Sequence, residues 1–189
     1  MSSPPASEAP RLSDAHRHPF SLISNTSAKS PCKTDRVGDV QNIMDKSIGR
    51  PVLRIAGKVS ANNYADFDNL HLTGALLYLQ LRPLSGTATL HLEVLTSHNV
   101  PLRITMSTLY AADPPRFLGR SLRLPLPPHN GWMVIFLDLN AILAKYCMPR
   151  GAATVPTLMA IRRLQVCSNN PNLTLTLTLT LALTLILKP

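Results

Sequence analysis

The 189-residue chain has few aromatic and few acidic side chains. Aromatic residues make up 5% of it, with a single Trp, and 10 Asp and Glu stand against 19 Lys and Arg. So few rings provide few stacking platforms, which argues against sugars and single-stranded nucleic acids as ligands of first choice. The shortage of acids leaves a net charge of +9. That charge favours an acidic partner such as nucleic acid, anionic lipid or an acidic protein polymer.

Cysteine is also scarce. Cys32, Cys147 and Cys167 have neither the number nor the spacing of a disulfide scaffold or a zinc knuckle. The first ten residues lack the basic and apolar regions of a secretory signal peptide. We therefore expect reduced thiols and a protein that is not secreted.

Familiar catalytic motifs are missing. The sequence has no Gly-x-Ser-x-Gly elbow, no phosphate-binding glycine loop and no His-Glu-x-x-His. Asp66 and Asp68 are close enough to act as paired carboxylates, but the favoured interpretation is a polar loop in which both are solvated. His16 and His18 have metal-ligand chemistry, but their position in a polar leader argues against a metal site. We expect a protein that is not an enzyme and that needs no cofactor or metal.

A hydrophobic period of two dominates the region from Val52 to Cys167. The runs 87–95, 102–107 and 122–126 alternate apolar with polar residues. This pattern predicts antiparallel strands with one face on a core and the other in water.

Three further runs, 53–56, 75–81 and 132–139, are apolar on both faces. They predict central strands that are covered on both sides. The dipeptide Asn130-Gly131 lies between two apolar runs, which predicts a hairpin at that point.

One segment has helical spacing. Ile142, Leu143 and Tyr146 share a face, and Asn140 stands where it can cap the first turn. This predicts a two-turn helix packed on the strands. We interpret Trp132 as a core anchor beside the hairpin rather than as a platform for a ligand.

After this helix the strand period returns in residues 157–167. Its predicted inward face consists of Leu158, Ala160, Leu164 and Val166. About seven short strands with one helix predict an all-β fold, an antiparallel β-sandwich of the jelly-roll type with one short α-helix.

The predicted domain organisation has three parts: a flexible Ser/Pro-rich leader (1–31), a sandwich domain (32–170) and a Leu-Thr low-complexity tail (171–189). A hexanucleotide DNA repeat encodes Pro-Asn in one reading frame and Leu-Thr in another. We therefore interpret the tail as a gene-model artefact that replaces the true C-terminus. Sequencing the transcript across the Asn170 codon tests this interpretation.

Six segments occur together and in order. They are His18-Pro19-Phe20, Gly38-Asp39-Val40 with Asp45-Lys46, 52–64, 76–84, Gly131-Trp132 with 136–139, and 161–167. This collinear set resembles the cilia- and flagella-associated domain family of the axonemal and centriolar inner junction, over residues 18–168. Within this family the set resembles the version of the domain that stands at the N-terminus of a centriolar WD-repeat protein.

The resemblance implies a β-sandwich with a short helix, in agreement with the periodicity. It also implies a non-enzymatic structural role at the inner junction of doublet or triplet microtubules, in a cilium, flagellum, basal body or centriole. The implied partners are tubulin and other inner-junction proteins, with no membrane, and nucleic acid is disfavoured. Because the exterior of tubulin is acidic, a basic module suits this partner.

The predicted contact face collects basic residues from the second half of the chain. From Pro115 onward, eight basic residues stand against one acid. The candidates are Arg116, Arg120, Arg123, Lys145, Arg150, Arg162 and Arg163. Arg162 and Arg163 are neighbours in a predicted strand, so we expect their side chains on opposite faces. A solvated surface that only keeps the protein soluble is the other interpretation of these charges.

The alternative function is that of a carbohydrate-binding β-sandwich module, because jelly-roll folds often hold sugars. It requires exposed aromatic platforms, of which this sequence has few. A nucleic-acid-binding role rests on charge alone, and an enzyme ranks last because no catalytic motif is present.

Overall fold

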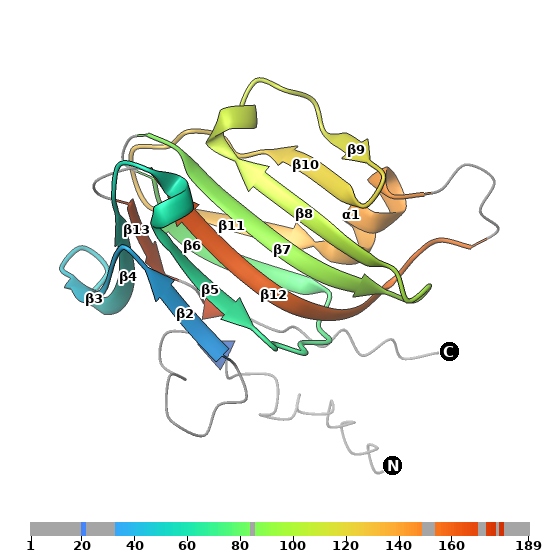
Figure 1. Cartoon of the computed structure of the whole chain (residues 1–189), viewed down its shortest axis with the longest axis horizontal. Coiled ribbons are helices and arrows are strands. Elements are labelled where there is room, and N and C mark those ends of the chain that lie inside the picture. The colour runs from blue at the N-terminus through green and yellow to red at the C-terminus, as the bar shows by residue number, and fades with distance from the viewer. Residues whose placement is uncertain are drawn as a thin grey trace, which may run out of the picture.

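The computed structural model describes residues 20–21, 33–83, 86–148, 154–169, 173–176 and 178–179. In this part of the chain the strands form two facing sheets and one additional two-stranded pair, with one short α-helix at an end of the sandwich (Figure 1). The predicted all-β sandwich with a single short helix is therefore confirmed.

The larger sheet has seven described strands, in the spatial order β2-β5-β12-β7-β8-β10-β9. Their bounds are β2 Lys33–Val37, β5 Tyr64–Asp68, β12 Leu158–Ser168, β7 Ala88–Thr96, β8 Pro101–Ser107, β10 Ser121–Pro125 and β9 Arg116–Leu118. Neighbouring strands run antiparallel, except that β10 runs parallel to β8.

The smaller sheet has five described strands, in the order β11-β6-β13-β4-β3. Their bounds are β11 Met133–Asp138, β6 Leu76–Arg82, β13 Leu173–Thr176, β4 Arg50–Ala56 and β3 Asp39–Asp45. The separate pair consists of β1 (Phe20–Ser21) and β14 (Thr178–Leu179). Two short 3-10 helices, η2 (Ser60–Asn62) and η3 (Thr108–Tyr110), lie on connections.

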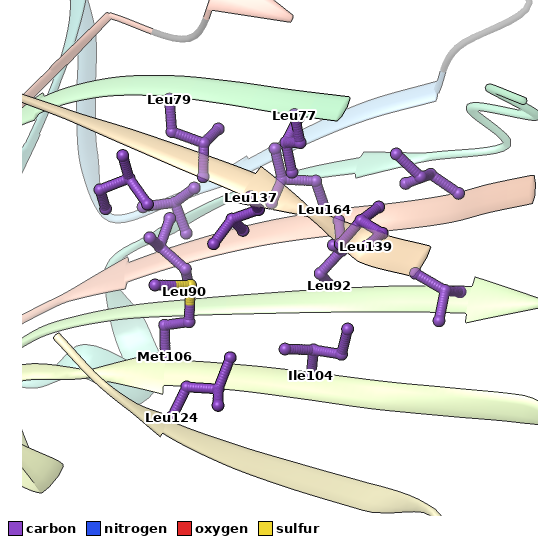
Figure 2. Packing of buried hydrophobic residues seen from close by; sticks show 14 of the residues in the cluster. Leu77, Leu79, Leu90, Leu92, Ile104, Met106, Leu124, Leu137, Leu139 and Leu164 are labelled. Atoms are coloured by element: carbon purple, nitrogen blue, oxygen red, sulfur yellow. The ribbon is translucent and has the colours of Figure 1, made fainter. Parts of the chain in front are cut away.

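The core lies between the two sheets. Every second residue of β7 is buried, and β6 shows the same alternation on the opposing sheet. Figure 2 shows side chains from both sheets, among them Leu79 and Leu90, gathered in the space between the sheets. Each such leucine contributes roughly 1.5–3 kcal/mol through the transfer of its side chain out of water. The predicted alternation is confirmed in β7 and β10. In β8 it holds for the apolar residues, but the predicted solvent face is wrong at Thr105 and Ser107, which are both buried.

The predicted central position is right for β4 and β6, which each have a paired strand on both sides, but β11 is an edge strand among the described residues. The predicted cover on both faces fits β4, whereas every second residue of β6 is only half-buried. On its outer face Val134 is 64% exposed and Phe136 is 51% exposed. The prediction for 132–139 is therefore wrong, because an apolar run does not reveal what covers its outer face. The ring of Tyr78 on β6 covers part of Phe136, with the ring centroids 4.8 Å apart.

The predicted hairpin at Asn130-Gly131 is also wrong. Strand β10 pairs within the larger sheet and β11 pairs with β6 in the smaller one, so this connection crosses between the sheets. Trp132 lies on the crossing, half-buried and outside the main core cluster. Its Nε1 donates a hydrogen bond to Ser47 Oγ at 3.0 Å, and the guanidinium of Arg82 lies 5.3 Å from the ring centroid. The ring ties the crossing to the β3–β4 turn, which corrects its predicted role as a core anchor.

The helix α1 (Leu139–Tyr146) is the predicted two-turn helix, but Asp138 caps it instead of the predicted Asn140. Asp138 Oδ1 accepts a hydrogen bond from Ala141 N at 3.0 Å and so satisfies a donor of the first turn. Asn140 lies inside the helix, where its Oδ1 accepts from Leu158 N at 2.8 Å. The predicted cap thus connects the helix to the start of β12.

A register shift in β12 changes which residues face the core. The strand is out of step with β7 between Ile161 and Arg163, and Ile161 and Leu164 are both buried. Arg162 and Arg163 lie between these two inward-facing residues, so both side chains lie on the outer side. The prediction of opposite faces is wrong because it assumed an unbroken period. For the same reason Ile161 replaces Ala160 on the inward face.

The start of the Leu-Thr repeat forms strand β13. Leu173–Thr176 pairs antiparallel with both β4 and β6, in the middle of the smaller sheet. Farther on, Thr178–Leu179 pairs with Phe20–Ser21 near the other end of the sequence. The three-part domain division and the artefact interpretation of the tail stay predictions.

Candidate partner-binding surface

The outer face of the seven-stranded sheet carries most of the predicted contact residues. The parallel pairing of β10 with β8 places Arg123 opposite Thr105 and Ser121 opposite Arg103. The antiparallel pairing of β10 with β9 then places Arg116 directly opposite Arg123. Three strands therefore bring arginines that are distant in sequence onto one part of the sheet surface.

The β9–β10 hairpin is the most basic part of this surface. Its turn contains Gly119, whose φ of +61° lies in the left-handed region that favours glycine. Arg116, Arg120 and Arg123 are all exposed on the hairpin or its turn. The backbone oxygen of Arg120 accepts a hydrogen bond from Arg103 N at 2.9 Å, which fixes the turn against β8.

A hollow of about 220 Å³ lies between this hairpin and the segment before it, lined by Tyr110, Asp113, Pro114, Arg116 and Arg123. The guanidinium of Arg123 lies 5.4 Å from the centroid of the Tyr110 ring. Such a distance gives a cation–π attraction that holds the guanidinium in place.

The ion pairs of the described residues include neither Arg116 nor Arg123. Their guanidinium groups keep hydrogen-bonding capacity for a partner.

Arg163, also a predicted contact, is held inside the protein's own charge network. Its Nε donates to both carboxylate oxygens of buried Asp66, at 2.8 and 3.1 Å, and its Nη2 donates to Asp66 Oδ2. Its Nη1 lies 3.9 Å from Glu93 Oε1, which also pairs with Arg103 Nη2 at 2.8 Å. The hydrogen bond to Asp66 raises the pKa of Arg163 above its ordinary value. Asp66 lies in strand β5, so the predicted solvated polar loop is wrong at this residue.

The remaining predicted contacts are scattered. Arg162 is exposed on the outer face at the register shift of β12. Lys145 is exposed on α1, where its Nζ lies 5.2 Å from the centroid of the Tyr146 ring. Arg150 lies outside the described residues. The structure thus brings Arg116, Arg120 and Arg123 together and leaves Lys145 on a different element.

A second hollow, of about 310 Å³, lies elsewhere on the same sheet face. It is lined by Ser60, Ala61, Tyr64, Thr89, His91, Gln165 and Cys167. The ring of His91 bonds through Nδ1 to Thr105 Oγ1 at 3.0 Å. Burial, followed by the positive charge of Arg103, lowers the pKa of His91 below its ordinary value of 6.5. A neutral imidazole therefore lies at the centre of the polar face.

Two thiols are buried in the described residues, Cys147 and Cys167. Burial raises the pKa of each to about 11. Because the thiolate is the reactive form, neither sulfur has the character of a nucleophile.

No group of three His, Cys, Asp or Glu in the described residues is placed to hold a metal ion. His16 and His18 lie outside those residues. None of the described helices is long and apolar enough to cross a membrane.

Two residues of this surface, Arg103 and Tyr110, are not among the predicted contacts. Arg103 stands among the outward residues of the alternating run 102–107, so its outward direction was readable, but it precedes the basic half of the chain. Tyr110 gave no signal, because its contact with Arg123 depends on how the connection between β8 and β9 folds back.

These features define a class: an all-β sandwich of two facing sheets with one short helix and an arginine-rich hairpin at the edge of the larger sheet. The chain belongs to the CFA20 domain family, whose profile matches residues 12–173. This finding confirms the resemblance drawn from the six collinear segments.

Relatives of the chain include a protein named for the centriole proteome and proteins named for WD repeats. The chain is 31% identical over 167 residues to Centriole proteome protein 16 of Chlamydomonas reinhardtii, covering 83% of this chain and 8% of that protein. It is 26% identical over 183 residues to WD repeat-containing protein 90 of Xenopus tropicalis, covering 81% of this chain and 10% of the relative. The human WD repeat-containing protein 90 is 33% identical over 157 residues, covering 71% of this chain and 9% of the relative.

The chain thus spans about a tenth of the length of the curated relatives that it matches. The family and a centriolar relative agree with the predicted location at cilia, basal bodies or centrioles. The names of the family and its relatives point to structural proteins of these organelles rather than to enzymes.

Proposed function

We propose that the protein is a non-enzymatic structural component of cilia, basal bodies or centrioles that binds the microtubule wall at the inner junction of doublets or triplets. Family membership and the centriolar relative support the setting. The observation that carries the binding role is the β9–β10 hairpin, which carries three exposed arginines, two of them directly opposite each other on its strands.

The physical reason is charge complementarity. The exterior of tubulin is acidic, and positive potential on a binding surface steers association and fixes orientation. Arginine also pairs with carboxylates through two parallel hydrogen bonds, which a solvated lysine does not offer. An exposed arginine hairpin whose guanidinium groups lack a carboxylate partner within the described residues suits such a surface.

Co-sedimentation of the full chain with stabilised microtubules across a salt series tests the proposal. The charge reversals Arg116→Glu, Arg120→Glu and Arg123→Glu, made together, are expected to lower the affinity at low salt by about 1.5 kcal/mol, or roughly tenfold, and to flatten the salt dependence. Circular dichroism checks that the variant is folded.

The matched control reverses three exposed basic residues near the smaller sheet: Lys46→Glu, Arg50→Glu and Lys58→Glu. It changes the net charge by the same amount but leaves the hairpin intact. Equal loss of binding in both variants would mean that net charge alone drives association. Unchanged binding in the hairpin variant would remove the hairpin from the interface.

The carbohydrate alternative has one specific observation in its favour, the hollow around Tyr64. An aromatic ring lies there beside His91 and Gln165, the combination of one platform and polar groups that sugars use. Binding on a glycan array that disappears with Tyr64→Ala would support this function. An array without bound glycans would eliminate it.

A further inference from the structure

The cross-strand pair Arg116 and Arg123 is unfavourable in the isolated protein. Two residues directly opposite each other on neighbouring antiparallel strands have Cβ atoms about 4.5–5.5 Å apart, and like charges at such positions repel. Within the described residues neither guanidinium has a carboxylate in ion-pair distance. An anion placed between them would therefore relieve repulsion as well as gain hydrogen bonds.

The hollow beside this pair has walls of mixed character. Tyr110 and Pro114 contribute apolar surface, and Arg116 and Arg123 contribute donors. A volume of about 220 Å³ holds a side chain rather than a cofactor. The ring of Tyr110 also orients Arg123 from one side, which reduces the entropy that the guanidinium loses when it binds.

The charge of the hollow selects among anions. Two arginines and the carboxylate of Asp113 line it, so its formal charge is +1. A single carboxylate neutralises that charge. A phosphate carries between about −1.5 and −2 charges at neutral pH, and Asp113 would repel the excess.

We propose that the hollow lined by Tyr110, Asp113, Pro114, Arg116 and Arg123 is a carboxylate clamp that binds a glutamate side chain of an acidic peptide segment. The two guanidiniums hold the carboxylate, and Tyr110 and Pro114 contact its methylene groups. This inference deepens the proposed function: it names the glutamate side chain as the group that the microtubule partner presents to the hairpin. It rests on the proposed function only for the identity of that partner.

The test measures binding of a fluorescent hexaglutamate peptide with blocked ends to the full chain by anisotropy at low salt. Arg116→Gln and Arg123→Gln are each expected to weaken binding about tenfold, since a hydrogen-bonded charge is lost. Arg50→Gln is the matched control, because it removes an exposed arginine from the smaller sheet. An equal effect of all three substitutions would overturn the clamp.

A second comparison tests the choice of carboxylate over phosphate. The wild-type chain is expected to bind hexaglutamate more tightly than a phosphoserine peptide of the same length, and Asp113→Asn is expected to reduce or reverse this preference. A wild-type preference for the phosphoserine peptide would overturn the assignment to glutamate.

The same peptide separates this inference from the proposed function. If hexaglutamate binds through Arg116 and Arg123 but the full chain does not co-sediment with microtubules, the clamp is supported and the proposed partner is wrong. If microtubules bind through the hairpin and excess hexaglutamate does not compete, the proposed function stands and the clamp is overturned.

Discussion

The outer face of the seven-stranded sheet carries two groups of arginines: Arg163 on β12, and the pair Arg116 and Arg123 on β9 and β10. The two groups differ in the side chains that surround them. On β12, Arg163 donates hydrogen bonds to buried Asp66 and lies beside Glu93. On β9 and β10, Arg116 and Arg123 lie opposite each other and take part in none of the described ion pairs. The protein's own acids therefore engage Arg163, whereas Arg116 and Arg123 have no acidic partner within the described residues.

The difference teaches that a basic residue must be judged by its neighbours across the sheet. Arg163 has the same charge as Arg123, yet its guanidinium is already occupied by Asp66 Oδ1 at 2.8 Å. Binding of an external carboxylate to Arg163 would first have to displace that internal one and leave it buried without a partner. The contacts with Asp66 and Glu93 give Arg163 a role within the sheet, and its role as a partner contact stays a prediction.

The largest effect that sharpens this comparison is on stability. Arg163→Met is expected to lower the free energy of unfolding by about 2 kcal/mol, because the buried carboxylate of Asp66 loses its hydrogen-bonded partner. Arg123→Met, which leaves no buried charge behind, should stay within about 0.5 kcal/mol of wild type. Urea denaturation followed by circular dichroism measures both free energies of unfolding. An unchanged m-value checks that the variants expose the same surface on unfolding as wild type. Equal losses in the two variants would contradict the distinction between the two groups.

A smaller expected effect is the pH dependence of stability that comes from His91, whose strand β7 lies between β12 and β8. His91 is opposite Gln165 on one side and Thr105 on the other, and burial lowers its pKa from 6.5. The unfolded chain binds a proton more readily than the folded one, so stability contributed by neutral His91 is lost as the pH falls below about 6.5.

We expect His91→Gln to flatten the fall in unfolding free energy from pH 7 towards pH 5. Urea denaturation at a series of pH values measures this slope. An identical slope in the variant and in wild type would show that the imidazole does not titrate differently in the folded protein.

The smallest expected effect is a gain in stability. Arg116→Gln removes the like-charge contact with Arg123 and should raise the free energy of unfolding by a few tenths of a kcal/mol, roughly the lower end for cross-strand pairs. Because added salt screens that repulsion, the gain should shrink as the salt concentration rises. Thermal denaturation at low and high salt measures it. A clear loss of stability at low salt would mean that Arg116 makes favourable contacts that outweigh the repulsion.

The candidate site could be predicted from the sequence only in part. The high density of basic residues after Pro115 was readable, and it included the three arginines of the hairpin. Their separation from Arg163 was not readable, because Asp66 lies 97 positions earlier in the chain and reaches Arg163 through the pairing of β5 with β12. Tyr110 lies on the connection between β8 and β9, and no local sequence pattern predicts that this connection brings its ring to Arg123.

What the sequence by itself determined is seven of the described strands and, where the alternation is unbroken, the side of a strand that faces the core. Alternation in β7 records burial directly, because successive side chains of a strand point to opposite faces. Family membership was readable in the same way, from segments that kept their order.

Only the tertiary structure decided which strands pair and what lies across from each charge. It placed β10 beside β8 in one sheet and β11 beside β6 in the other, although Asn130-Gly131 suggested a hairpin between them. It also turned Arg162 and Arg163 to the same side through one register shift in β12. The physical reason is that strand pairing and register shifts depend on contacts between residues distant in sequence. A hydrophobic period shows only which face of a single strand is buried.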